Sequence, residues 1–406
     1  MAQVLYIGIM KKELRKGLRT WIEIDKKAIK NNFNSFKKLI PKSCKFLAVV
    51  KSNAYGHNLT EFSKEMEKLG VDFLGVDSIT EALALRREKI KIPILVLGYT
   101  LPERIEDAIK NKISISVSSF ETISAIKKLV CHASLAKTGG KKLNIHIKVD
   151  TGMGRHGFLL NDQKRLISEL KKITTKNDKN HLVAGNIKVE GLFTHFSSAK
   201  RPDDLRYTNV QIEIFNKWIE IFKANGLRPI IHACATSGTI LFPDAHFDMV
   251  RIGIGLYGEW PSKEIMKAKE DEIKLLSIMS WKTIIGEIKK IPAGERIGYD
   301  GTKVLEKDSI IAICPIGYWH GYPRALSNKG FVLIKGKEAK ILGRVCMDII
   351  IVDVSDILGI KVGEEVTILG ESGNKKITPN NISDMIDGSD YELLTGINPL
   401  IKRIYL

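Results

Sequence analysis

The residues of this chain that could do covalent chemistry stand directly after short apolar runs. Lys51 follows the run Phe46–Val50, and a lysine at such a place is usually an exposed charge, because buried lysines are rare. A lysine that is partly desolvated and near other cations instead loses its proton easily and attacks carbonyl groups. Lys51 is therefore a candidate for holding a carbonyl-containing cofactor covalently.

Small and hydroxyl residues follow two later apolar runs, where they could bind a phosphate group. Thr236 and Ser237 follow one of these runs, and Gly253 and Gly255 follow the next. Taken alone, such glycines form turns more often than they bind ligands. Combined with a reactive lysine on the same face of one domain, they suggest pyridoxal 5′-phosphate as the cofactor.

Two further basic side chains have comparable positions. Arg251 closes an apolar run, and a cation facing a pyridine nitrogen would disfavour its protonation, which weakens the electron sink and suits simple proton transfer. The alternative for Arg251 is a salt bridge within the domain wall. His195 is about as often a core histidine as a proton relay, although its place at the end of a strand favours the relay.

The elements that must position these residues alternate short apolar runs with longer charged stretches of helical periodicity. Nearly continuous apolar runs, each followed by a helix, indicate parallel strands buried on both faces. The expected strands are Phe46–Val50, Asp72–Val76, Ile94–Leu97, Ile113–Val117, Ile145–Val149, Val189–Thr194, Pro229–His232 and Met249–Ile252. The expected helices include Glu61–Leu69, Ile79–Arg87, Glu103–Lys110, Phe120–Val130, Lys164–Ile173 and Tyr207–Asn225. The sequence therefore predicts a (β/α)₈ TIM-type barrel, whose working residues lie at the carboxyl ends of the strands.

The pattern changes after Tyr257, which predicts a second domain. From Ile278 onward the apolar runs are short, β-branched and punctuated by glycine, as in a smaller, mostly antiparallel β domain. We expect a disordered or late-ordering N-terminal tail at residues 1–18, the barrel at residues 19–262 and the β domain at residues 275–406. Residues 19–25 could add a strand to the β domain.

The composition limits the partners and the compartment. The 406 residues carry 64 Lys and Arg against 46 Asp and Glu, a formal net charge of +18, so binding to nucleic acid has to be considered. The lysines are spread along nearly every expected helix without a nucleic-acid-binding motif, and no apolar run approaches the roughly 18 residues of a membrane helix. We therefore expect neither a nucleic-acid nor a membrane partner. The five cysteines are far apart and form no C-x-x-C pair, which favours a reducing cytoplasm and no metal site.

From Trp21 to about Tyr405 the chain resembles bacterial alanine racemases, fold type III enzymes that depend on pyridoxal 5′-phosphate. The segments that carry the resemblance in the barrel are Val49–His57, Asp150–Arg155 and Asp248–Ile254. The resemblance implies a barrel followed by a β domain, and an isomerase that interconverts L-alanine and D-alanine and so supplies D-alanine for peptidoglycan.

The resemblance also implies roles for residues of the barrel. Lys51 would carry the cofactor, Tyr55 would bind its phosphate, and Arg155 would bind its phenolic oxygen and assist with the substrate carboxylate. Lys148 falls where members of the family can have a carbamylated lysine that orients this arginine. The other implied cofactor-binding residues are His195, Thr236, Arg251, Gly253 and Ile254.

In the β domain the resemblance implies Tyr299 as a catalytic tyrosine, Tyr318 as a residue of the substrate entrance, and Met347 and Asp348 as substrate-binding residues. It implies a head-to-tail homodimer with shared active sites, in which Tyr299, Met347 and Asp348 face the barrel of the other subunit. Racemisation needs one proton removed from one face of Cα and another delivered to the opposite face. Lys51 and Tyr299 of the partner subunit are the expected pair of bases.

Several positions depart from the pattern common in the family. Ala235–Thr236 replaces Asn-Ser, Trp319–His320 replaces Ala-Asp, Lys200 replaces an acidic residue, and Pro399 replaces a phosphate-binding tyrosine. These changes leave open a racemase of broader specificity, acting on serine or other amino acids. A related decarboxylase built on the same kind of barrel is a further alternative, although the catalytic cysteine and acidic substrate ligands usual in those enzymes are not found.

Overall fold

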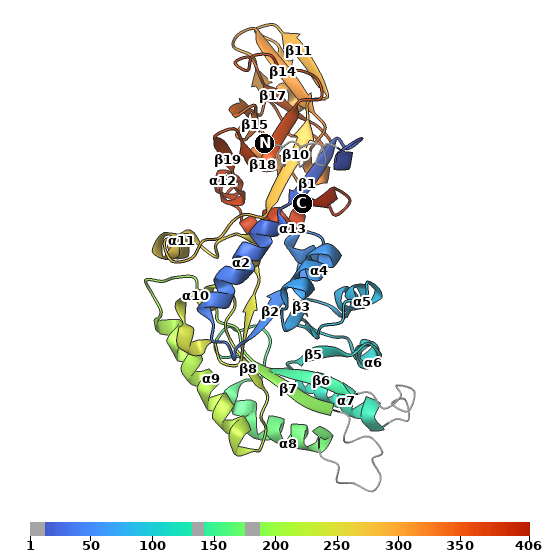
Figure 1. Cartoon of the computed structure of the whole chain (residues 1–406), viewed down its shortest axis with the longest axis vertical. Coiled ribbons are helices and arrows are strands. Elements are labelled where there is room, and N and C mark those ends of the chain that lie inside the picture. Colours follow the sequence, from blue (N-terminus) through green and yellow to red (C-terminus); the bar gives the residue numbers. More distant parts are fainter. Residues whose placement is uncertain (1–12, 132–141, 175–186) are drawn as a thin grey trace. The chain divides into compact units, whose positions relative to one another are not determined.

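A computed structural model describes residues 13–131, 142–174 and 187–406 (Figure 1). The chain divides into two compact units. The barrel unit comprises Ile29–Ala54 and Leu59–Leu276, and the β unit comprises the described residues up to Ala28 together with Tyr55–Asn58 and Ser277–Leu406. Residues 1–12 of the expected tail lie outside the described residues.

Among the residues that the structure describes, eight parallel strands form the sheet of the barrel unit, in the order β8-β7-β6-β5-β4-β3-β2-β9. Their bounds are β2 (Lys45–Val49), β3 (Phe73–Val76), β4 (Ile94–Val96), β5 (Ile113–Val117), β6 (Leu143–Lys148), β7 (Ile187–Phe193), β8 (Ile230–His232) and β9 (Met249–Ile252). Asp248 N donates to Ile231 O (3.0 Å) and Arg251 N donates to Cys234 O (2.9 Å), and these bonds join β9 to β8. The sheet therefore closes on itself, and the predicted (β/α)₈ barrel is confirmed.

The barrel strands form where the sequence offers short apolar runs that can be covered on both faces. Every residue of β3, β4, β5 and β9 is buried, as parallel strands require between a filled interior and an outer ring of helices. Two of the eight expected ranges, Ile113–Val117 and Met249–Ile252, match the observed strands residue for residue. The other strands differ by one or two residues at their ends, where strand ends are least specified by sequence.

Helices surround this sheet (Figure 1). Their bounds are α2 (Lys26–Leu39), α4 (Leu59–Leu69), α5 (Ile79–Arg87), α6 (Ile105–Lys110), α7 (Phe120–Cys131), α8 (Gln163–Thr174), α9 (Arg206–Ala224), α10 (Thr236–Leu241) and α11 (Lys263–Lys269). In α8 the residues Leu166, Ile167, Leu170 and Ile173 are buried, which is the spacing of one helical face turned to the sheet.

Two helical segments differ from the expectation. The helix predicted at Glu103–Lys110 is divided: a 3₁₀ turn, η1 (Pro102–Arg104), precedes α6, and Arg104 at the junction has φ −100° and ψ −3°. The stretch between the two expected domains contains α11, whose first turn is capped by Ser262 accepting a hydrogen bond from Ile265 N (3.3 Å).

The described part of the β unit contains three sheets, of seven, three and two strands. In the largest, β1 (Thr20–Ile24) pairs antiparallel with β10 (Met279–Ile284) and parallel with β20 (Lys402–Tyr405). The remaining strands are β11 (Glu287–Ile291), β12 (Arg296–Ile297), β13 (Lys303–Val304), β14 (Ser309–Cys314), β15 (Phe331–Ile334), β16 (Lys337–Lys340), β17 (Ile350–Asp353), β18 (Glu365–Ser372) and β19 (Lys375–Ile377). Among these described strands only the β1–β20 pair is parallel, so the predicted mostly antiparallel β domain is confirmed.

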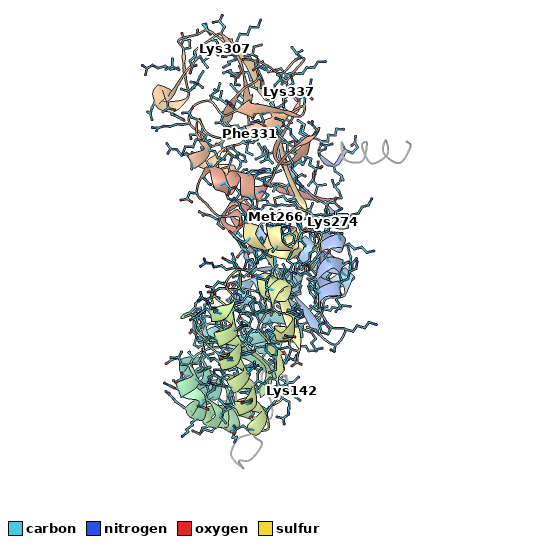
Figure 2. The ribbon with its side chains drawn as sticks, turned by 90° about the vertical axis from the view of Figure 1, so that its left-hand side faces the viewer. Lys142, Met266, Lys274, Lys307, Phe331 and Lys337 are labelled. Carbon is cyan, nitrogen blue, oxygen red and sulfur yellow. The ribbon has the colours of Figure 1, made fainter. Side chains whose placement is uncertain are left out.

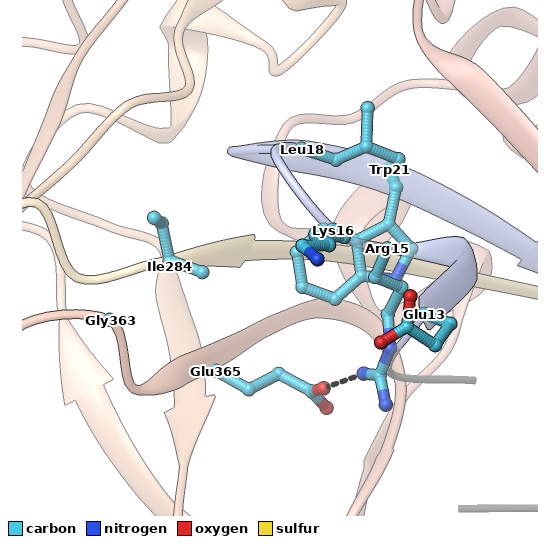
Figure 3. A pocket seen from close by; sticks show the side chains of 8 residues that line it. All are labelled: Glu13, Arg15, Lys16, Leu18, Trp21, Ile284, Gly363 and Glu365. Carbon is cyan, nitrogen blue, oxygen red and sulfur yellow. Dashed lines mark hydrogen bonds and ion pairs between the residues drawn. The ribbon is translucent and has the colours of Figure 1, made fainter. Parts of the chain in front are cut away.

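The residues just before β1 lie against this unit. Arg15 Nη1 lies 2.6 Å from Glu365 Oε2 and 3.6 Å from Glu23 Oε1, and its guanidinium covers the ring of Trp21. Figure 3 shows a pocket of about 530 Å³ whose lining includes Arg15, Trp21 and Glu365 together with Ile284 and Gly363. Residues 13–18, which were expected to belong to the tail, are thus held by an ion pair and an aromatic contact.

Many of the described lysines lie on solvated surface. Lys142 and Lys274 of the barrel unit and Lys307 and Lys337 of the β unit are exposed, and their side chains stand out from the ribbon in Figure 2. Within the described ranges no helix has the length and apolar character needed to cross a membrane.

We predict that Gly191→Ala destabilises the barrel unit. A Cβ at this position in β7 would lie 2.0 Å from Nδ1 of the buried His146, so the ring or the strand must move. Overpacking of this kind costs about 1–3 kcal/mol, which urea unfolding would measure. The control is Gly396→Ala, because an added Cβ there meets nothing within 4 Å. Equal stability of the two variants would contradict the prediction.

Candidate active site

The carboxyl end of the barrel brings together basic side chains from four strands. Arg251 in β9 donates from Nη2 to His195 Nδ1 (3.2 Å), which follows β7. Lys148 is the last residue of β6, and Lys51 follows β2. The positive charges of both lysines lower the pKa of the His195 imidazole. Lys51, His195 and Arg251, which were predicted from their strand-end positions, therefore interact in the barrel unit, and Lys148, which the family resemblance implied, interacts with them.

Lys51 begins a left-handed helical turn, α3 (Lys51–Tyr55). Ser52, Asn53 and Ala54 have φ of 56°, 55° and 52°. None of these is glycine, and each such residue costs roughly 1–2 kcal/mol relative to the right-handed region. Strain of this kind persists only where surrounding bonds enforce it, and it concentrates at functional sites.

The bonds that enforce the turn come from both ends of the segment. Ala54 N donates to Val50 O (2.9 Å), and Asn53 Oδ1 accepts from Leu59 N at the start of α4 (2.9 Å). Ser52 N donates to Glu81 Oε1 (2.6 Å). The backbone around Lys51 is therefore bound to β2, α4 and α5.

Glu81 binds two loops with one carboxylate. Its Oε2 accepts from Asp77 N (2.8 Å) and Ser78 N (3.4 Å), completing the capping box of α5, while its Oε1 holds Ser52. Asp77 follows β3, and its Oδ1 lies 3.6 Å from Lys51 Nζ. The cap of α5 thus also places a carboxylate beside the lysine amine.

Lys148 has a depressed pKa. Only 7% of the residue is exposed, and burial, followed by the charges of Arg155 and Arg251, lowers the pKa of its amine to about 8. Asp150 shapes the loop that carries Arg155, accepting from Gly152 N (2.8 Å), Met153 N (2.8 Å) and Arg155 N (3.0 Å). Burial alone would raise the pKa of the Asp150 carboxyl, but the hydrogen bonds from these amides lower it.

Arg251 is 3% exposed, and its guanidinium is bound on most sides. Nη2 donates to Ala233 O (2.7 Å) and Thr194 O (2.8 Å) as well as to His195, and Nη1 donates to His232 Nδ1 (3.0 Å). Burial lowers the pKa of the guanidinium to about 10, so it is still a cation at neutral pH. No hydrogen-bond partner for its Nε–H is found among the described residues.

Small groups lie beside these cations, where a phosphate could be held. Gly253 N donates to the hydroxyl of the buried Thr236 (3.1 Å), which leaves the hydroxyl proton of Thr236 available to another acceptor. Thr236 also begins α10, and the first amides of a helix have no acceptor within it. An amine at Lys51, donors around Thr236, Gly253 and Ile254, and the free N–H of Arg251 fit the aldehyde, phosphate and ring nitrogen of pyridoxal 5′-phosphate.

The β unit holds the remaining predicted residues. Tyr299, in the turn η6 (Tyr299–Gly301), is 69% exposed. Tyr318 N donates to Cys346 O (3.0 Å) and Trp319 N donates to Met347 O (2.9 Å), which ties the turn η7 (Tyr318–His320) to the segment before Asp348.

Tyr55 also belongs to the β unit, where its ring lies 6.1 Å from that of Tyr391. Burial raises the pKa of the Tyr55 hydroxyl to about 12, so it remains a hydrogen-bond donor. Pro399, one of the departures noted above, is exposed in this unit, and Trp319 is too.

The sequence analysis missed five polar residues of the barrel: Asp77, Glu81, His146, Glu190 and His232. Two signals for them were present. Ser78 and Glu81 have capping-box spacing directly after a strand, and polar residues within otherwise apolar barrel strands must find partners in the interior. Across the described ranges no group of three or more His, Cys, Asp or Glu could hold a metal ion.

Comparisons with known proteins agree over both units. The chain matches the family models of the alanine racemase N-terminal domain at residues 24–261 and the alanine racemase C-terminal domain at residues 278–405. It is 39% identical over 387 residues to an alanine racemase of Methanococcus maripaludis, which covers 95% of this chain and 98% of that one. An alanine racemase of Leptospira interrogans is 36% identical over 392 residues, covering 95% of each chain.

Solved structures show the same fold. The alanine racemase of Clostridium difficile 630 superposes with a TM-score of 0.86 at 35% identity, over 96% of both chains. A histidine racemase from Leuconostoc mesenteroides superposes with a TM-score of 0.83 at 27% identity, over 96% of this chain and 99% of that one.

We predict that Glu81→Ala loosens the turn at Lys51. The variant removes the acceptor of three backbone amides, and the loss of a helix cap costs about 1–2 kcal/mol in urea unfolding. The matched control is Glu121→Ala, because Glu121 stands in the first turn of α7 and hydrogen-bonds Ser119. If both variants lose the same stability, the bond to Ser52 contributes nothing beyond helix capping.

Proposed function

The chain belongs to the alanine racemase family, and we propose that it interconverts L-alanine and D-alanine with pyridoxal 5′-phosphate as cofactor. We further propose that it works in the cytoplasm as a homodimer and supplies D-alanine for peptidoglycan. The match over both units, including the β unit with Tyr299, favours a racemase over a decarboxylase.

The observation that carries the proposal is the hydrogen bonding of the Arg251 guanidinium. A guanidinium bound on both Nη atoms, with Nε–H left to donate, suits an acceptor that must stay unprotonated. A pyridine nitrogen facing this cation would remain a weak electron sink, because a second proton beside the guanidinium is unfavourable. A weak electron sink is sufficient for proton transfer at Cα and disfavours reactions that go beyond proton transfer.

The family resemblance implies which residues would hold the cofactor. Lys51 would bond its aldehyde carbon, Thr236, Gly253, Ile254 and Tyr55 would bind its phosphate, and Arg155 and His195 would lie beside its polar substituents. When bound, pyridoxal 5′-phosphate supplies an electron-withdrawing ring that acidifies the α-hydrogen of an attached amino acid.

The proton transfers themselves belong to side chains. The amine of Lys51, once released from the cofactor, would take or return the α-proton on one face. The carboxylate of Asp77 lies 3.6 Å from this amine. The hydroxyl of Tyr299 of the partner subunit would serve the other face. Arg155, Met347 and Asp348 would orient the substrate carboxylate.

Exposed side chains of the β unit support the homodimer. Tyr299, Tyr318, Trp319 and Met347 each expose between 43% and 69% of their surface. Large apolar side chains gathered in neighbouring turns are usual at protein interfaces. A partner's barrel would cover them and would complete an active site shared between subunits.

A racemase of broader specificity is the second candidate, because the chain is 27% identical to a histidine racemase along almost its whole length. Lys200 and the pair Trp319–His320, with Tyr318 beside them, are the residues expected to decide which side chains can enter. Tests with serine and histidine distinguish the two candidates.

We predict that the purified chain with pyridoxal 5′-phosphate racemises L-alanine. Chiral chromatography should find D-alanine, and Lys51→Ala should lose about 10²–10⁴-fold in rate, the usual contribution of a positioned base. Lys274→Ala, which removes an exposed lysine, is the control and should keep the wild-type rate. In D₂O, Tyr299→Phe should retain α-hydrogen exchange for one enantiomer and lose it for the other.

A wild-type protein that leaves L-alanine unchanged would refute the proposed function. Faster turnover of L-serine or L-histidine than of L-alanine would favour the second candidate. Equal loss of exchange for both enantiomers in Tyr299→Phe would remove the two-base assignment.

We also predict that Lys148 is carbamylated. Its neutral amine can attack CO₂, forming an N–C bond and releasing a proton, and the resulting anion would lie near Arg155 and Arg251. At constant dissolved CO₂ the carbamate should increase as the pH rises through about 8, because the amine then loses its proton. Labelling with ¹³C-bicarbonate and NMR detects it, and a signal that persists in Lys148→Ala would assign it elsewhere.

A further inference from the structure

A chain of buried polar groups continues from Arg251 into the barrel interior, and the proposed reaction uses none of its other members. Arg251 Nη1 lies 3.0 Å from His232 Nδ1, and His232 Nε2 lies 3.0 Å from His146 Nδ1. His146 Nε2 lies 3.3 Å from Glu190 Oε2. Both histidines are fully buried, so these contacts are not exchanged for water.

The direction of every hydrogen bond in this chain follows by elimination. A guanidinium can only donate, so His232 Nδ1 must accept, and a neutral His232 then carries its proton on Nε2. That proton is donated to His146 Nδ1, which leaves the proton of His146 on Nε2, directed at Glu190. Burial, above all, lowers the pKa of both imidazoles, and this keeps each of them neutral at pH 7.

Glu190 is the acceptor at the end of the chain. Its Oε2 accepts from Ser114 Oγ (2.7 Å) and its Oε1 from Asn144 Nδ2 (2.9 Å), in addition to the bond from His146. Burial would raise the pKa of the carboxyl, but the bonds from His146 and Ser114 outweigh it and lower the pKa. Lys188 Nζ, which is largely exposed, lies 3.7 Å away. Glu190 is therefore an anion bound only by donors.

The backbone is irregular at this residue. The pairing of β6 with β7 runs Ile145 to Val189 and then His146 to Gly191, so Glu190 is the extra residue of a β-bulge. Bulges redirect a side chain, and they are frequent beside active sites. The next residue, Gly191, lacks the Cβ that would occupy the place of the His146 ring. The bulge at Glu190 and the missing side chain of Gly191 both allow the contact between Glu190 and His146.

Aromatic packing holds the middle of the chain in place. The ring of Phe193 stacks on that of His232, with centroids 4.8 Å apart and planes 9° apart. The guanidinium of Arg251 lies 5.4 Å from the centre of the Phe193 ring. His232 can therefore rotate little, and the donor and acceptor positions derived above are geometrically fixed.

We propose that Glu190 is a positioning residue of the racemase, which acts through His146 and His232 to hold the guanidinium of Arg251 in place with Nε–H free to donate. This inference rests on the proposed function. The carboxylate provides the negative end of an ordered row of donors and acceptors that begins at the cation. Without it, His146 loses its acceptor, either imidazole can exchange tautomers, and Nη1 of Arg251 loses its fixed partner.

The first test is independent of catalysis. Histidine ¹⁵N chemical shifts of the full chain, recorded with and without added pyridoxal 5′-phosphate, report which ring nitrogen carries the proton. The variants His146→Gln and His232→Gln assign the signals. We expect Nε2–H in both histidines of the wild type, and a changed His146 signal in Glu190→Ala. A proton on Nδ1 of either histidine in the wild type would overturn the proposal.

The second test measures turnover of the holoenzyme. Glu190→Ala should lower kcat by about 100-fold and Glu190→Gln, which keeps one acceptor oxygen, by less, with KM within about threefold of the wild-type value, because small displacements of a catalytic group have effects of this size. The control is Glu169→Gln, since Glu169 pairs with Lys127 and Lys172 on the outer helices and should leave kcat unchanged.

The outcomes separate this inference from the proposed function. A wild type that does not racemise refutes the function, while the ¹⁵N spectra still decide the order of the hydrogen bonds. A wild type that racemises, with kcat of both Glu190 variants within threefold of it, overturns the positioning role. If Glu190→Ala fails to fold, Glu190→Gln alone decides, and an unchanged kcat in that variant counts against the proposal.

Discussion

The burial of the Arg251 guanidinium is the constraint on which the rest of the barrel unit depends. A charge that is 3% exposed has lost its water, and burying it is costly unless hydrogen bonds replace that water. The barrel supplies acceptors in place of water: the carbonyl oxygens of Thr194 and Ala233 and the imidazoles of His195 and His232. These groups come from the ends of two neighbouring strands, so the cation can be satisfied only when the sheet is closed. The guanidinium of Arg251 therefore has its acceptors only in the closed barrel.

A second constraint acts at Lys51, where the backbone is held in a left-handed turn by bonds from other elements. The turn is unfavourable by itself, and its stability comes from α4 and from the capping box of α5. One carboxylate, that of Glu81, binds the lysine turn and the loop of Asp77 together. The local strain is thus linked to helix capping, and the position of a reactive amine follows from an ordinary device of secondary structure.

The cations of the barrel mouth also affect one another. Lys51, Lys148, Arg155 and Arg251 all contribute to the low pKa of the His195 imidazole, after burial, and the same surroundings depress the pKa of Lys148. Such a concentration of positive charge is unfavourable without anions. A phosphate, a phenolic oxygen and a substrate carboxylate would each relieve it, which accounts for these few cations, whereas the many exposed lysines need no such explanation.

The sequence by itself determined the barrel and β units, the strand ends that carry Lys51, His195 and Arg251, and the family. It could do so because apolar periodicity and strand-end chemistry are local signals. It did not reveal that Asp77 would lie beside Lys51, that Glu81 would bind Ser52, or that Glu190, His146 and His232 would form one row with Arg251. Those contacts join residues 19 to 86 positions apart, and one of them depends on a β-bulge. Only tertiary structure decided them, because the closed sheet brings strands distant in sequence within hydrogen-bond reach, and the dry interior then forces each polar group to take a specific partner.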